Sequence, residues 1–120
     1  MYSREILDHF QNPRNAGEID APDAWVQLEN PACGDVLKLS AKLEKGRIID
    51  IRFRAKGCVP AMACGSAMTV LAKGKTVDEA RSITKDDLAR RVGGLLEASG
   101  HAAQLAVDTL KTLLGKSGSM

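Results

Sequence analysis

Two short stretches of this 120-residue chain carry thiols in settings that favour metal or sulfur chemistry. In residues 30–35, NPACGD, the Cys33 thiol and the Asp35 carboxylate stand two positions apart in a predicted turn. Pro31 fixes one backbone dihedral and Gly34 permits a tight bend, so both side chains can reach one point. Turn positions are exposed, which favours a functional role for Cys33 over a place in a core.

The second thiol, Cys58, follows a predicted strand and immediately precedes a predicted helix. Unpaired backbone N–H groups and the helix dipole at that position favour thiolate over thiol. A thiolate is the form that binds a metal ion or a sulfide-bridged iron, or that accepts persulfide sulfur. Taken alone, Cys58 could equally well be a small buried hydrophobe.

His101 lies near the start of the last predicted helix, and a neutral imidazole is a normal ligand for zinc or iron. Taken singly, His101 fits a first-turn surface residue and Asp35 fits a turn carboxylate that accepts backbone hydrogen bonds. Together with the two thiols, they favour a site. Cys64 differs, because it stands six residues after Cys58 in an apolar helix, about 240° around the axis. We therefore predict that Cys64 is a core residue.

Composition narrows the class of protein. Seventeen basic and fifteen acidic residues leave a formal charge of +2, which indicates no strong field of either sign. One Trp, one Tyr and two Phe offer few rings for stacking on bases, so nucleic-acid binding is not expected. No apolar run could span a bilayer and no signal peptide is evident, so we expect a cytoplasmic protein with no membrane association. Three cysteines, an odd number, exclude a complete disulfide framework and favour metal or redox chemistry.

The hydrophobic pattern predicts three strands followed by helices. Apolar or alternating runs cover residues 24–28, 35–43 and 47–55, and Lys45-Gly46 predicts a hairpin between the last two. Strands first and helices afterwards indicate an α+β fold, in which a small three-stranded antiparallel sheet has helices packed on one face. Without repeats or linkers, residues 1–120 are expected to form one domain.

Helices are predicted before and after the strands. A leading helix over residues 2–10, with a Ser3 cap, places Ile6, Leu7 and Phe10 at helical spacing. An apolar, buried helix follows Pro60 and closes at Lys73-Gly74. Two short helices each begin with a hydroxyl cap and a carboxylate three residues later. The last helix is expected from about Ser99 to Leu114, with Gly115 as its stop and a frayed tail after it. The two caps of the short helices are Thr76 and Thr84.

With these residues in view, the chain resembles the IscU/NifU-type family along nearly its whole length. The most specific part of the resemblance is Asn-Pro-x-Cys-Gly-Asp with a downstream Gly-Cys. The other matching stretches are Tyr2-Ser3, Asp8-His9, Asn12-Pro13-Arg14-Asn15, Lys73-Gly74-Lys75, His101, Leu105-Ala106 and Asp108. The resemblance implies a SufE/NifU-like fold.

The resemblance also implies a function. Family members accept sulfur from a cysteine desulfurase, combine it with iron on three cysteines and pass the labile [2Fe–2S] or [4Fe–4S] cluster to recipient apoproteins. Cys33 and Cys58 match the first two of those cysteines, and Asp35 matches the carboxylate that keeps the cluster labile. His101 matches the histidine beside the third cysteine. The implied role is that of a scaffold or carrier, not an enzyme.

This sequence departs from the family pattern at two places. The third cysteine should directly follow His101, but the residue there is Ala102. Cys33, Cys58, Asp35 and His101 remain as a mixed ligand set, which suits iron and also tetrahedral zinc. The family's Leu-Pro-Pro-Val-Lys segment, the docking site of a Hsp70-type chaperone, is replaced by LLEAS at residues 95–99. Docking of that chaperone is therefore not expected.

Two other functions stay open. One is a zinc-binding sulfur acceptor, in which the ion protects the thiols until a desulfurase displaces it. The other is a degenerate paralogue that regulates the assembly machinery without binding metal. Cys64 could relay persulfide sulfur from Cys58, although buried thiols are usually inert. Both a monomer and a dimer that shares one cluster between subunits fit the sequence.

Overall fold

The computed structural model describes residues 2–31, 34–94 and 100–118. In chain order the elements are α1 (Arg4–Gln11), β1 (Ala24–Glu29), β2 (Val36–Glu44), β3 (Arg47–Lys56), α2 (Val59–Ala72), α3 (Val77–Arg81), α4 (Lys85–Arg91) and α5 (Gly100–Gly118). The expected α+β class is confirmed. The strands form an antiparallel sheet of order β1-β2-β3.

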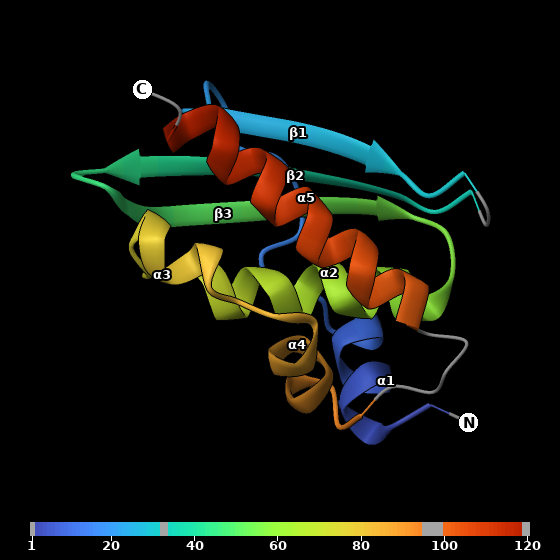
Figure 1. Ribbon diagram of the computed structural model, residues 1–120. Coiled ribbons are helices and arrows are strands. Elements are labelled where there is room, and N and C mark those ends of the chain that lie inside the picture. Colours follow the sequence, from blue (N-terminus) through green and yellow to red (C-terminus); the bar gives the residue numbers. More distant parts are fainter. Residues whose placement is uncertain (1, 32–33, 95–99, 119–120) are drawn as a thin grey trace.

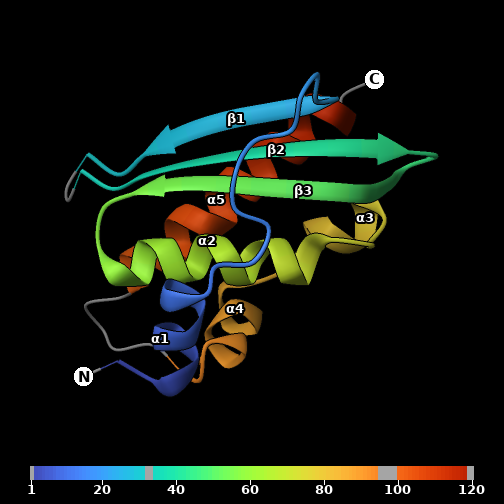
Figure 2. The ribbon, with the colours of Figure 1, turned by 180° about the vertical axis from the view of Figure 1, so that it is seen from behind.

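The sheet carries its helices on one face, as predicted (Figure 1). Its apolar side chains meet α2 and α5, and α1 and α4 pack beyond α2, away from the sheet (Figures 1 and 2). Lys45 and Gly46 both have positive φ, of 52° and 76°, which is the geometry of a tight two-residue hairpin turn between β2 and β3. A register shift between Lys42 and Leu43 follows this turn, and the shifted pairing brings the start of β2 beside the end of β3.

Local capping rules define the helix starts. The Ser3 hydroxyl accepts a hydrogen bond from the Ile6 N–H, and both Thr76 with Glu79 and Thr84 with Asp87 form the reciprocal capping box that the sequence predicted. The helix α2 is apolar and mostly buried. No helix in the described part of the chain is both long and apolar enough to cross a membrane.

One expectation about the helices was wrong. The helix α5 continues through Gly115 to Gly118, because Gly115 keeps a helical backbone in open space and nothing there forces the chain to turn. In α1 only Ile6 of the three apolar residues is buried, and its partner on the inner face is His9, whereas Leu7 and Phe10 are exposed. The expected start of the last helix at Ser99 lies outside the described residues.

Polar contacts from the middle of α2 hold the N-terminal segment in place. The His9 ring nitrogen Nδ1 lies 2.8 Å from the Ser66 hydroxyl, which also accepts a hydrogen bond from the Arg14 N–H at 2.9 Å. The Asn15 side-chain amide donates to the Thr69 hydroxyl at 3.1 Å. His9 and residues 12–15 belong to the stretches that carry the family resemblance, and here they attach α1 and the segment after it to α2.

The metal-free protein should lose stability as the pH falls from about 7.5 to about 5.5. Burial, followed by the charge of Arg14, lowers the pKa of His9 below its ordinary value of 6.5, so the folded protein holds the neutral ring. The unfolded chain then binds more protons in this range, and the free energy of unfolding decreases with falling pH. Urea unfolding at several pH values measures this slope.

His9→Gln should flatten the slope, because the titrating ring is gone. His101→Gln is the matched control, since His101 is exposed and is the other histidine of the chain. A slope that persists in His9→Gln would contradict the assignment to His9.

Candidate functional site

The candidate site is built where β2 begins and β3 ends. The register pairs Val36 with Lys56, so Asp35 and Gly57 lie side by side at one end of the sheet. Cys58 follows Gly57 directly and is the N-cap residue of α2, whose first turn contains Pro60. Three elements therefore meet at one carboxylate and one thiol.

Asp35 holds Cys58 through both carboxylate oxygens. The Cys58 N–H donates to Oδ1 at 3.2 Å, and the Cys58 thiol donates to Oδ2 at 3.3 Å. Asp35 is only 4% exposed, although it is an acidic residue. A buried carboxylate is expensive without hydrogen-bond donors, so these contacts fix the position of the Cys58 side chain.

Gly57 makes this close approach possible. Its φ is +142°, and a Cβ built there would lie 2.1 Å from Asp35 Oδ1 and 2.8 Å from Asp35 Cγ. Any side chain at this position would displace the carboxylate. Sequence reasoning noted Gly57 as part of a family stretch but missed this role, which depends on a contact between residues distant in the chain.

The protonation state of Cys58 differs from the sequence-based expectation. Cys58 is an exposed residue, but its partial burial is the largest effect and raises the pKa of its thiol, and the hydrogen bond and negative charge of Asp35 raise it further. The Ala61 N–H at the start of α2 lowers this pKa, as predicted for a helix N-terminus, but it does not prevail. In the metal-free protein the geometry therefore favours the thiol, not the thiolate.

The turn before Asp35 has the tight geometry that the sequence predicted. Gly34 has a φ of +75°, its N–H donates to the Asn30 carbonyl at 2.7 Å, and the Asn30 N–H donates to the Asp35 carbonyl at 2.8 Å. Cys33 and Ala32 lie outside the described residues. The predicted convergence of Cys33 and Asp35 on one point thus stays a prediction.

His101 is exposed on the first turn of α5. It lines a hollow of about 300 Å³ together with Asn30 and Pro31, so the imidazole stands beside the segment that leads to Cys33. Ala102, the residue after His101, is only 4% exposed. The other lining residues of this hollow are Leu28, Glu29, Gln104, Leu105 and Asp108.

The structure thus brings Asp35 and Cys58 into contact, and it places His101 separately, beside Asn30 and Pro31. Among the described residues, no group of three or more His, Cys, Asp or Glu side chains is arranged to hold a metal ion. Cys64 is fully buried in the core, as predicted, and burial raises the pKa of its thiol to about 12.

Known proteins similar to this chain belong to the family that the sequence resembles. The family described as "NifU-like N terminal domain" matches residues 1–116. The chain is 45% identical over 111 residues to "Iron-sulfur cluster assembly scaffold protein IscU 1" of Archaeoglobus fulgidus, covering 92% of this chain and 72% of that protein. It is 40% identical over 117 residues to "Iron-sulfur cluster assembly scaffold protein IscU" of Escherichia coli, covering 94% and 91%.

A solved structure shows the same fold. The N-terminal part of a nitrogen-fixing NifU-like protein from Brucella abortus superposes with a TM-score of 0.79 at 21% identity, covering 97% of this chain and 93% of that one. Fold and site together define an α+β domain with a carboxylate-held thiol where the sheet meets its first covering helix. The chain belongs to the NifU-like N-terminal domain family.

Gly57→Ala should destabilise the protein by about 2 kcal/mol more than Gly46→Ala. Both residues have positive φ, but a Cβ at Gly46 meets nothing within 4 Å, whereas a Cβ at Gly57 meets Asp35. Urea unfolding of the two variants separates backbone strain, shared by both, from displacement of the carboxylate, expected only in Gly57→Ala. Equal losses of stability in the two variants would contradict the prediction, because they would show that displacing the Asp35 carboxylate costs no free energy.

Asp35→Asn should lower the pKa of the Cys58 thiol, because it removes a neighbouring negative charge that raises this pKa. The rate of alkylation of Cys58 by iodoacetamide at pH 7.5 should rise by about threefold or more, since one pKa unit changes the thiolate fraction about tenfold. Mass spectrometry of the digested protein distinguishes Cys58 from the other two thiols. Asp108→Asn, on α5, is the control, and an unchanged rate in Asp35→Asn would contradict the prediction.

Proposed function

We propose that this protein is a scaffold on which an iron–sulfur cluster is assembled and from which it is passed on. The observation that carries the proposal is the Cys58 thiol held at the start of α2 by a buried carboxylate, in a chain 45% identical to a protein named as such a scaffold. The cluster is cargo here, not a resident cofactor. The protein binds it and does not turn over a substrate as an enzyme does.

In this proposal the ligands are Cys33, Cys58, Asp35 and His101. A [2Fe–2S] core takes four protein ligands, and two thiolates with one carboxylate and one imidazole are chemically acceptable to iron. The close contact of Cys58 Sγ and Asp35 Oδ2 supports binding of one metal ion by both residues, because the two ligand atoms already lie beside one another. An iron ion bound before sulfide is delivered would use the same four ligands.

Loading must remove the thiol proton. Metal binding requires thiolate, so an incoming ferrous ion displaces the proton that Cys58 shares with Asp35, and the proton passes to solvent. The cation then compensates the negative charge that opposes ionisation in the metal-free protein. Metal affinity is accordingly expected to increase with pH.

The sulfur donor in this proposal is a cysteine desulfurase, and the recipients are iron–sulfur apoproteins. A thiolate of the scaffold attacks the terminal sulfur of the donor persulfide, the donor's S–S bond breaks, and the donor cysteine leaves as thiolate. We place this chemistry in the reducing cytoplasm, where thiols remain free. Residues 95–99, where chaperone docking is not expected, lie outside the described residues.

Anaerobic reconstitution with ferrous iron, cysteine and a cysteine desulfurase should give visible sulfide-to-iron absorption, with equal amounts of bound iron and acid-labile sulfide. Cys58→Ala should abolish the colour because it removes a ligand, whereas Cys64→Ala, which changes a buried core thiol, should keep it. Ala102→Cys restores the family's third cysteine and should slow the loss of colour to a chelator.

Other outcomes would overturn the proposal and identify one of its competitors. Tight, colourless zinc in the natural chain, with colour only in Ala102→Cys, would identify a zinc-binding sulfur acceptor. No metal in either protein would identify a regulatory paralogue.

A further inference from the structure

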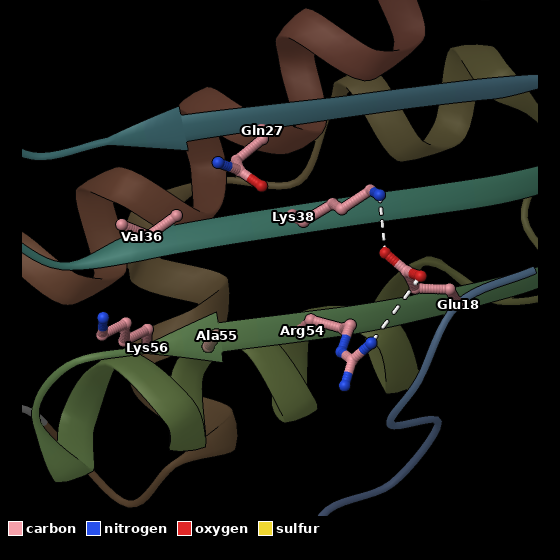
Figure 3. A pocket seen from close by; sticks show the side chains of 7 residues that line it. All are labelled: Glu18, Gln27, Val36, Lys38, Arg54, Ala55 and Lys56. Atoms are coloured by element: carbon pink, nitrogen blue, oxygen red, sulfur yellow. Dashed lines mark hydrogen bonds and ion pairs between the residues drawn. The ribbon is translucent and has the colours of Figure 1, made fainter.

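The sheet face opposite the helices is only partly covered. The segment between α1 and β1 crosses this outer face (Figure 2). There the Ile19 N–H donates to the Ser40 hydroxyl at 3.2 Å, and the Lys42 ammonium donates to the Ala21 carbonyl at 3.1 Å. Toward the start of β2 and the end of β3, the outer face is hollowed over about 400 Å³ (Figure 3). Seven residues line this basic hollow: Glu18, Gln27, Val36, Lys38, Arg54, Ala55 and Lys56.

Strand register gathers the cations of the basic hollow. Lys38 on β2 stands directly opposite Arg54 on β3, and Val36 stands opposite Lys56. Lys56 is two residues beyond Arg54, so both side chains leave the same face of β3. Like charges directly opposite one another destabilise a sheet, so this arrangement needs a compensating anion.

Glu18 supplies part of that compensation from the crossing segment. Its carboxylate lies 2.6 Å from Lys38 Nζ and 3.7 Å from Arg54 Nη1, between two strands (Figure 3). Among the described residues, Lys56 makes no ion pair within 4 Å. One carboxylate and three cations line the basic hollow, so its net charge is positive. The position of Glu18 shows that a carboxylate fits between Lys38 and Arg54.

An aromatic platform borders the basic hollow. Trp25 on β1 is 52% exposed, and the Lys38 ammonium lies 4.8 Å from the centre of its ring. Trp25 is also the single tryptophan of the chain. Its fluorescence therefore reports on the surroundings of Lys38.

We propose that the basic hollow docks an extended acidic segment of a protein partner. Side chains on one face of an extended strand repeat every two residues, roughly 6.6–6.8 Å apart, and Arg54 and Lys56 repeat at the same interval on β3. Alternate carboxylates of such a segment thus match the cations that Glu18 leaves uncompensated. The overall charge of +2 and the scarcity of aromatic rings disfavour a nucleic acid.

The position of the basic hollow relates it to the candidate site. Val36 and Lys56 line its end, and the next residues along the two strands are Asp35 and Gly57, followed by Cys58. A partner held here therefore lies against the same strand ends that carry the candidate site, on the outer face of the sheet. The docking itself depends on the charges of the basic hollow and their spacing and does not rest on the proposed cluster chemistry, so either can fail while the other stands.

The test is a titration of the metal-free protein with a capped peptide of four Ser alternating with three Glu, followed by Trp25 fluorescence. We expect saturable binding that weakens as salt is added, and no response to the same peptide with Gln in place of Glu. Backbone amide NMR shifts should fall on the outer-face ends of β2 and β3.

Charge variants make the assignment specific. Lys56→Glu should weaken binding about tenfold, whereas Lys111→Glu, the same change on the exposed side of α5, should change it less than about twofold. Glu18→Gln should strengthen binding, because it releases Lys38 and Arg54 for the peptide. Circular dichroism checks that the variants are folded.

Several outcomes would overturn the proposal. They are no binding of the Glu peptide, equal weakening in Lys56→Glu and Lys111→Glu, or weaker binding in folded Glu18→Gln. Double-stranded DNA that binds the same residues more tightly than the peptide would also overturn it.

Discussion

The buried carboxylate of Asp35 is the constraint on which the site depends. Removing a charge from water is costly unless donors replace the lost hydration, and the N–H and the thiol of Cys58 act as such donors. Because Cys58 is also the N-cap of α2, the same contacts fix where that helix begins relative to the sheet. The start of β2, the end of β3 and the start of α2 therefore behave as one unit, and Gly57 is the residue that lets them approach.

The layered fold gives this unit a rigid support and separates its two sides. On the inner face, α2 packs between the sheet and α1, and the network from Ser66 and Thr69 holds the N-terminal segment against it. On the outer face, the basic hollow ends beside the same strand termini. The strand ends can therefore hold the Cys58 thiol at one edge of the sheet while a partner binds the outer face.

Most of the fold could be predicted from the sequence because its signals are local. Alternating strands, the Lys45-Gly46 turn and the two capping boxes each depend on residues within a few positions of one another. The site was harder to predict from the sequence, because it depends on contacts between residues distant in the chain. The helix N-terminus at Cys58 does favour thiolate, but partial burial and a carboxylate 23 residues earlier in the chain prevail. The need for Gly57 also arises only when β2 and β3 are paired.

Ala102 bears on how firmly the proposed scaffold would hold its cargo. A carboxylate and an imidazole are harder and weaker donors to cluster iron than thiolate, so a site with two thiolates releases a cluster more readily than one with three. The hydrogen bond of the metal-free site also favours release of the cluster, because the Cys58 thiol donates to Asp35 again once it is protonated. A scaffold must bind long enough to complete assembly and then let go. Ala102 in place of a thiolate ligand would shift that balance toward release, with Asp35 as the group that positions the thiol and accepts its hydrogen bond.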